Sequence, residues 1–70
     1  MSLTKANARK LLASNLAFDR GIPIEAADDL IDHIQELLYD HYGGMGSYDS
    51  PESILTDFGI SSDLLWVFDS

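Results

Sequence analysis

Residues 25–41, EAADDLIDHIQELLYDH, carry the clearest periodicity in the chain and define its fold class. At about 100° per residue, the carboxylates fall on one side of a helix and the aliphatic side chains on the other. The carboxylate side, named the acidic face, comprises Glu25, Asp28, Asp29, Asp32, Glu36 and Asp40. The apolar side comprises Ala27, Leu30, Ile31, Ile34, Leu37 and Leu38. This segregation predicts a surface helix of a small bundle, and it accounts for each carboxylate without any catalytic role.

Residues that begin and end helices flank this segment. Pro23 suits a first helical position because it has no N–H to lose, and Glu25 in the first turn favours the helix dipole. Gly43 and Gly44 stop the pattern. We therefore expect the longest helix of the chain to run from about Pro23 to about Tyr42.

A first helix is predicted before it. Thr4 suits the N-cap, the helix is expected to run to about Phe18, and Gly21 suits a left-handed C-cap. Its buried face is expected to hold Ala8, Leu11, Leu12 and Leu16.

Two short helices are predicted after a glycine-rich loop, GGMGSYDS, at residues 43–50. Ser50 and Pro51 begin the third helix, which ends by Gly59, and Ser61 or Ser62 caps a last helix, DLLWVFD. LLWVF at residues 64–68 alone would also suit a short strand. We predict an all-α fold, a small bundle of about four short helices in one domain over residues 1–70, with residues 1–3 interpreted as an expression leader.

Composition limits the size of the core. A chain of 70 residues buries about 60% of its unfolded surface, and without cysteine it has no disulfide to compensate. The 46% hydrophobic content still predicts a folded domain despite a net charge of −8. No run of apolar residues is long enough to span a membrane, and LLASNLAF is a poor core for a signal peptide. We therefore expect a cytoplasmic protein.

The charges are unevenly distributed along the chain. Residues 1–18 carry +3 and no acid, whereas residues 19–70 carry −11, which together give −8. The basic segment would suit a targeting or nucleic-acid arm, but three charges make a weak patch. Packing against the acidic remainder is the interpretation we favour.

Metal binding and catalysis have weak candidates. Asp29, His33 and Glu36 have the spacing to share a divalent cation, but one helix surface does not supply the four ligands of a structural zinc site. DDLID at residues 28–32 matches a magnesium-binding pattern of isoprenoid enzymes, whose deep cavity this short chain cannot enclose.

His41 falls on the apolar side near the helix end and is expected to be partly buried. No nucleophile motif is present, so we expect no enzymatic activity and no cofactor.

The acidic surface and the last residues indicate a binding function. An acidic face disfavours nucleic acid and anionic membranes, and it attracts basic protein surfaces, although a role in solubility alone is an equal alternative. LLWVF is too apolar for a short helix to bury on all sides, so part of it should stay exposed, although Trp66 sealing the core is an equal alternative. The predicted partner-binding residues are Asp28, Asp32, Glu36, Asp40, Tyr39, Leu65, Trp66 and Phe68.

These features predict a small acidic protein-interaction module, a regulator, adaptor or inhibitor, with a homodimer as a further expectation. The alternative is a helix-turn-helix relative associated with transcription but without direct DNA contact, because SPESILTDFGISSDLLWVF resembles that motif in its turn. Its exposed positions offer Ser61, Ser62, Asp63 and Asp69 where a DNA reader needs basic or amide side chains.

Overall fold

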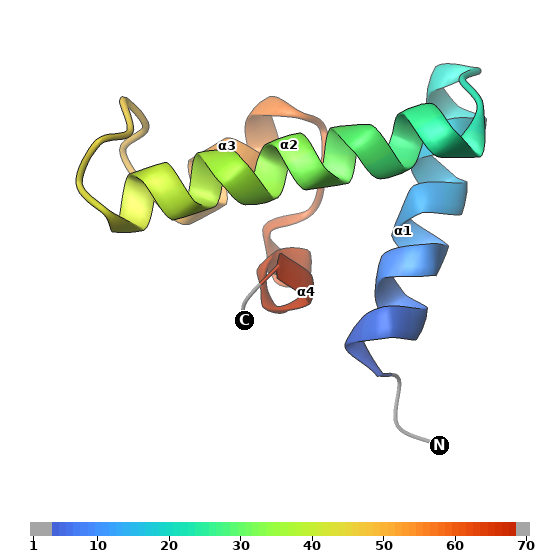
Figure 1. Ribbon diagram of the computed structural model, residues 1–70, viewed down its shortest axis with the longest axis horizontal. Coiled ribbons are helices and arrows are strands. Elements are labelled where there is room, and N and C mark those ends of the chain that lie inside the picture. The colour runs from blue at the N-terminus through green and yellow to red at the C-terminus, as the bar shows by residue number, and fades with distance from the viewer. Residues whose placement is uncertain (1–3, 69–70) are drawn as a thin grey trace. The chain divides into compact units, whose positions relative to one another are not determined.

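The computed structural model describes residues 4–68, which form four α-helices and one 3₁₀ turn and contain no strand (Figure 1). In chain order the elements are α1 (Lys5–Arg20), α2 (Ile24–Tyr42), α3 (Pro51–Asp57), η1 (Ser62–Leu64) and α4 (Leu65–Phe68). The predicted all-α class, the number of helices and the second helix as the longest are confirmed. The expected leader at residues 1–3, and Asp69, lie outside the described residues.

Side-chain hydroxyls begin two of the helices, as predicted. The Thr4 hydroxyl accepts a hydrogen bond from the Asn7 backbone N–H at 3.2 Å, and the Ser50 hydroxyl accepts one from the Ser53 N–H at 3.2 Å. Each bond satisfies a backbone donor that has no partner within the helix, a contribution of about 1 kcal/mol. At α2 the Ala27 N–H donates to the Pro23 carbonyl at 3.1 Å, so Pro23 precedes the helix by one residue instead of opening it.

The three longer helices end in the same way. In each, a glycine with positive φ follows the helix, and the next residue donates its N–H to a carbonyl five residues back, which defines a Schellman motif. The bonds run from Ile22 to Ala17 at 3.0 Å, from Met45 to Asp40 at 2.9 Å and from Ile60 to Leu55 at 2.9 Å, around Gly21, Gly44 and Gly59. Because the motif at Gly21 needs helical residues up to Arg20, α1 runs two residues past the predicted Phe18.

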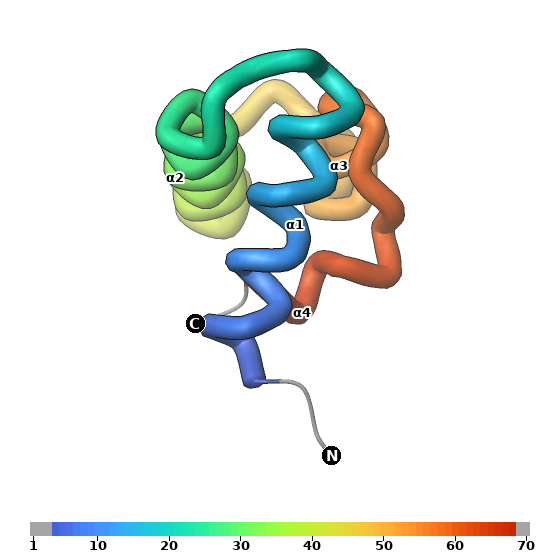
Figure 2. The backbone as a smooth tube through the Cα atoms, turned by 90° about the vertical axis from the view of Figure 1, so that its right-hand side faces the viewer, coloured from blue at the N-terminus to red at the C-terminus, as the bar shows by residue number. Residues whose placement is uncertain are grey.

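Two compact units divide the chain, Met1–Asp32 and His33–Ser70, and their boundary lies inside α2. In the first unit, a short turn at residues 21–23 joins α1 to α2 (Figure 2). The buried side chains of this unit are Ala8, Leu12, Ala13, Leu16, Ala27 and Ile31. This boundary falls within a continuous helix and not in a linker. The organisation of residues 1–70 as a single domain stays a prediction.

Leu11 does not belong to the buried face of α1, and that part of the sequence prediction was wrong. Its side chain is 55% exposed, whereas Ala13 is buried. At about 100° per residue, Leu11 lies some 60° outside the arc that runs from Ala8 through Leu12 and Leu16 to Ala13. The helix therefore turns Leu11 toward solvent.

In the second unit, α3, η1 and α4 contact one another. The buried side chains there are Ile34, Leu38, Ile54, Leu55, Ile60, Val67 and Phe68. The predicted last helix begins at Ser61, but its first turn is 3₁₀, because the Leu64 N–H bonds the Ser61 carbonyl three residues back at 3.0 Å. LLWVF is helical and not a strand. Among the described residues, no helix has the length and apolar character needed to cross a membrane.

Candidate functional site

The acidic face is exposed along the whole length of α2. All six of its carboxylates are solvent-accessible, and on a helix of about 100° per residue they span an arc of about 120°. Six pairs of these acids are three or four residues apart, the spacing at which helical side chains are neighbours. Like charges at that spacing destabilise a helix by about 0.2–0.5 kcal/mol per pair, so this surface opposes the stability of the helix that carries it.

Asp32 of the acidic face has a partner within the chain. Arg9 of α1 forms an ion pair with Asp32 of α2, within the first unit. The Asp32 side chain remains 66% exposed, and such surface pairs contribute about 0–1 kcal/mol. This ion pair joins the basic helix α1 to the acidic helix α2, which is the arrangement that the charge distribution along the chain favoured. Asp32 is thus already engaged, while Glu36 and Asp40 lie in the second unit, which carries no lysine or arginine.

Tyrosines lie within and beside the acidic face. Tyr39 and Tyr42 are both 61% exposed, and at three residues apart they are neighbours on the surface of α2. By helical angle, Tyr39 falls between Asp28 and Asp32 on the same arc as the carboxylates. Glu36, three residues earlier, is the carboxylate at neighbour spacing to Tyr39 on the helix surface, so this surface combines an apolar contact with negative charge.

The terminal LLWVF segment divides into exposed and buried side chains. Trp66 is 41% exposed and Leu65 is half-buried, so both reach the surface. Phe68 is only 5% exposed. Its ring belongs to the core of the second unit together with Val67, and its role in partner binding stays a prediction.

The metal candidates are not brought together as a site. Within residues 4–68, no group of three or more His, Asp or Glu side chains has an arrangement that would hold a metal ion. His33 is exposed, and its ring meets the Phe58 ring edge-on, with centroids 6.1 Å apart and planes at 83°. Asp29 and Glu36 are exposed on α2.

His41 is half-buried in the last turn of α2, which confirms its predicted side of the helix. Its ring meets that of Tyr42 edge-on at 5.9 Å. The loop backbone passes close by, because a Cβ placed on Gly46 would lie 3.0 Å from the His41 Cα. A side chain at position 46 would therefore press on the His41 backbone, and glycine avoids this contact.

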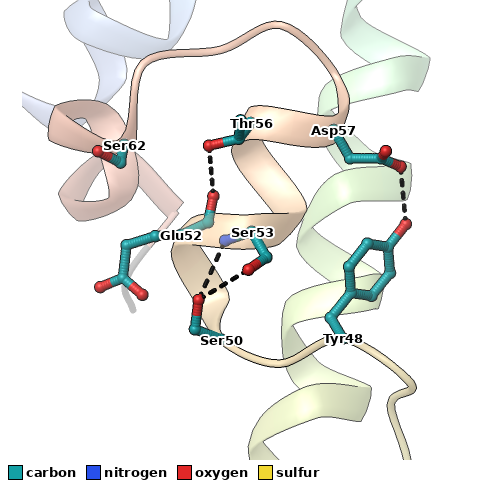
Figure 3. Close-up of a pocket in the computed structure, with 7 residues that line it drawn as sticks. All are labelled: Tyr48, Ser50, Glu52, Ser53, Thr56, Asp57 and Ser62. Carbon is teal, nitrogen blue, oxygen red and sulfur yellow. Dashed lines mark hydrogen bonds between the residues drawn. The ribbon is translucent and has the colours of Figure 1, made fainter.

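A shallow hollow of about 580 Å³ in the second unit was not predicted from the sequence (Figure 3). Hydroxyls and two carboxylates line it, from Tyr48, Ser50, Glu52, Ser53, Thr56, Asp57 and Ser62. It forms where the loop folds back on α3, and the sequence holds no periodic signal for such a contact.

The hydroxyls of this hollow serve the local structure. The Ser50 and Ser53 hydroxyls are 2.9 Å apart at the helix start, and the Thr56 hydroxyl donates to the Glu52 carbonyl at 3.0 Å (Figure 3). Tyr48 donates to the Asp57 carboxylate at 3.1 Å and ties the loop to the end of α3. That hydrogen bond raises the pKa of Tyr48, with desolvation and the charge of Asp57 adding to it. These contacts describe capping and loop attachment, not an activated nucleophile.

Comparison of this chain with protein-family models, with curated proteins and with solved structures returned no match.

Proposed function

We propose that this chain is a protein-interaction module that binds another protein through the acidic face of α2 and the aromatic side chains exposed in the second unit, acting as an adaptor or inhibitor. The observation that carries the proposal is Tyr39, an aromatic side chain 61% exposed within an arc of carboxylates. Tyrosine and tryptophan are enriched at the energetic centres of protein interfaces. Trp66 adds a second exposed aromatic ring.

Charge defines the partner that this surface fits. The second unit carries seven acids and no lysine or arginine, so its potential attracts a basic protein and repels nucleic acid and anionic lipid. Attraction of this kind raises the association rate and weakens as salt screens the charges. The like-charge pairs along α2 point the same way, because a cationic partner would relieve the repulsion between them.

Affinity capture with matched variants tests the proposal. The immobilised chain is exposed to lysate of the source cell, and the retained proteins are eluted with rising salt. We expect a stoichiometric basic protein that the wild type retains, that salt releases, and that Tyr39→Gln and Glu36→Lys lose.

Glu52→Lys is the control, since it makes the same charge change at an exposed glutamate of α3. Circular dichroism confirms that each variant is folded. Equal capture by all the variants, or no specific capture by the wild type, would contradict the proposal.

A further inference from the structure

The carboxylates predicted to bind a partner form one row along α2, named the acidic row. They follow one another at intervals of four residues: Asp28, Asp32, Glu36 and Asp40. Each lies about 6 Å along the helix axis and about 40° around it from the one before. Because side chains at this spacing are neighbours on a helix surface, the row is a continuous line of negative charge about 18 Å long.

Two basic side chains of α1 lie against the first half of the acidic row. Arg9 forms the ion pair with Asp32. Lys10, the next residue, lines a hollow of about 420 Å³ together with Asp28 and Asp32, and it shares a second hollow of about 260 Å³ with Asp28. All of these residues belong to the first unit, so the contacts lie within one compact part of the chain.

The second half of the acidic row lies in the other unit. Glu36 and Asp40 belong to His33–Ser70, which carries no lysine or arginine. Within each unit taken by itself, basic side chains therefore oppose the first half of the row alone.

We propose, building on the function proposed above, that α1 is an autoinhibitory element of this surface. In the free chain Arg9 and Lys10 occupy the first half of the acidic row, and a basic partner that binds the whole row displaces them. A competitor on the same chain acts at a high effective concentration, which a partner in solution has to match. α1 thereby favours a partner whose positive charge extends along the row over one that meets only its second half.

The ion pair that α1 contributes is open to exchange. The side chain of Asp32 is 66% exposed and that of Arg9 is 32% exposed, so a second cation can reach the carboxylate from solvent. Surface pairs of this kind are weak, so α1 lowers the affinity for a basic partner by a graded amount instead of blocking it. The loss of the pair should change Kd by about two- to fivefold.

Binding of a fluorescein-labelled octalysine peptide, measured by fluorescence anisotropy at 100 mM salt, tests the competition. The screening length is then about 10 Å, so the effect of a charge depends on its place in the chain. Arg9→Gln should bind the peptide about two- to fivefold more tightly than the wild type. Arg20→Gln is the control, because it makes the same change in net charge about 16 Å further along α1 and should change Kd less. Circular dichroism confirms that each variant is folded.

A double substitution separates competition from simple repulsion between Arg9 and the peptide. If Arg9 acts by holding Asp32, its replacement releases no carboxylate once Asp32→Asn has removed that charge. The gain from Arg9→Gln, measured in the Asp32→Asn chain, should therefore fall to the gain from Arg20→Gln. A gain that stays undiminished in the Asp32→Asn chain overturns the proposal, since Arg9 would then act by repulsion alone.

The same assay distinguishes failure of the autoinhibition from failure of the proposed function. A wild-type chain that does not bind the peptide, or that loses no more affinity with Glu36→Gln than with Glu52→Gln, contradicts both. A chain that binds through Glu36 but gains no more from Arg9→Gln than from Arg20→Gln overturns the autoinhibition and retains the proposed function.

Discussion

Replacing Glu36 by Gln should stabilise the protein, while the same replacement at Glu52 should destabilise it. Glu36 lies in the middle of α2, four residues from both Asp32 and Asp40, so its charge enters two of the repulsive pairs. At about 0.2–0.5 kcal/mol per pair, and with Asp32 partly neutralised by Arg9, the substitution should add about 0.5 kcal/mol. For a domain of this size that raises Tm by about 2–4 °C.

Glu52 is an exposed glutamate in a different helical position. It lies in the first turn of α3, where a negative charge is favourable to the partial positive charge of the helix start. Its replacement by glutamine should remove about 0.3–1 kcal/mol and lower Tm by a few degrees. The two variants change the net charge identically, so a difference in sign reports the local position of each charge.

Thermal melts followed by circular dichroism at 20 mM and at 1 M NaCl measure both shifts. The screening length falls to about 3 Å at 1 M, so both shifts should shrink toward zero there. A Glu36→Gln variant no more stable than the wild type at low salt would refute repulsion along α2. A shift that persists unchanged at 1 M would show that its origin is not electrostatic.

Three further predictions concern the loop and the surface. Gly46→Ala should lower the free energy of unfolding, measured in urea titrations, by about 1–2 kcal/mol, because the added Cβ would lie 3.0 Å from the His41 backbone. Gly43→Ala is the control and should be tolerated, since its nearest neighbours lie at 3.4 Å or more. The pKa of Tyr48 lies above its unfolded value of 10.0, so the stability from its bond to Asp57 is complete below pH 10 and is lost as pH rises through the folded pKa. Tyr48→Phe should flatten the decline in Tm as the pH rises above 10.0, and an unchanged decline would contradict this assignment. Fluorescence anisotropy with labelled DNA at 20 mM salt should detect no binding, since the second unit carries no lysine or arginine, and measurable affinity would instead favour a helix-turn-helix relative.

Sequence reasoning located helix ends well and surfaces less well. The ends at Thr4, Gly21 and Ser50 are set by local chemistry, because a hydroxyl next to backbone N–H groups or a glycine with positive φ acts within one turn. The buried side chains of α2, Ala27, Ile31, Ile34 and Leu38, also followed from periodicity, whereas Leu30 and Leu37 on the same predicted side are half-buried.

The prediction that was wrong at Leu11, and the burial of Phe68, both depend on contacts between elements. Leu11 and Phe68 have the same apolar chemistry, yet the first is exposed and the second is buried. Periodicity gives the direction of a side chain but not the width of the surface packed against it. Likewise, the bond from Tyr48 to Asp57 depends on where a glycine-rich loop returns to α3, which composition alone does not specify.

The three Schellman endings have a consequence for folding kinetics. Each of these helix ends is closed by a backbone hydrogen bond between residues only five apart, as from Ile60 to Leu55. The ordering of one helix end therefore requires no distant segment to be in place, and little loop-closure entropy is lost before native contacts form. Helical chains dominated by such local contacts reach the native state in about microseconds to milliseconds. The glycines at these ends thus shorten the conformational search, in addition to fixing where each helix stops.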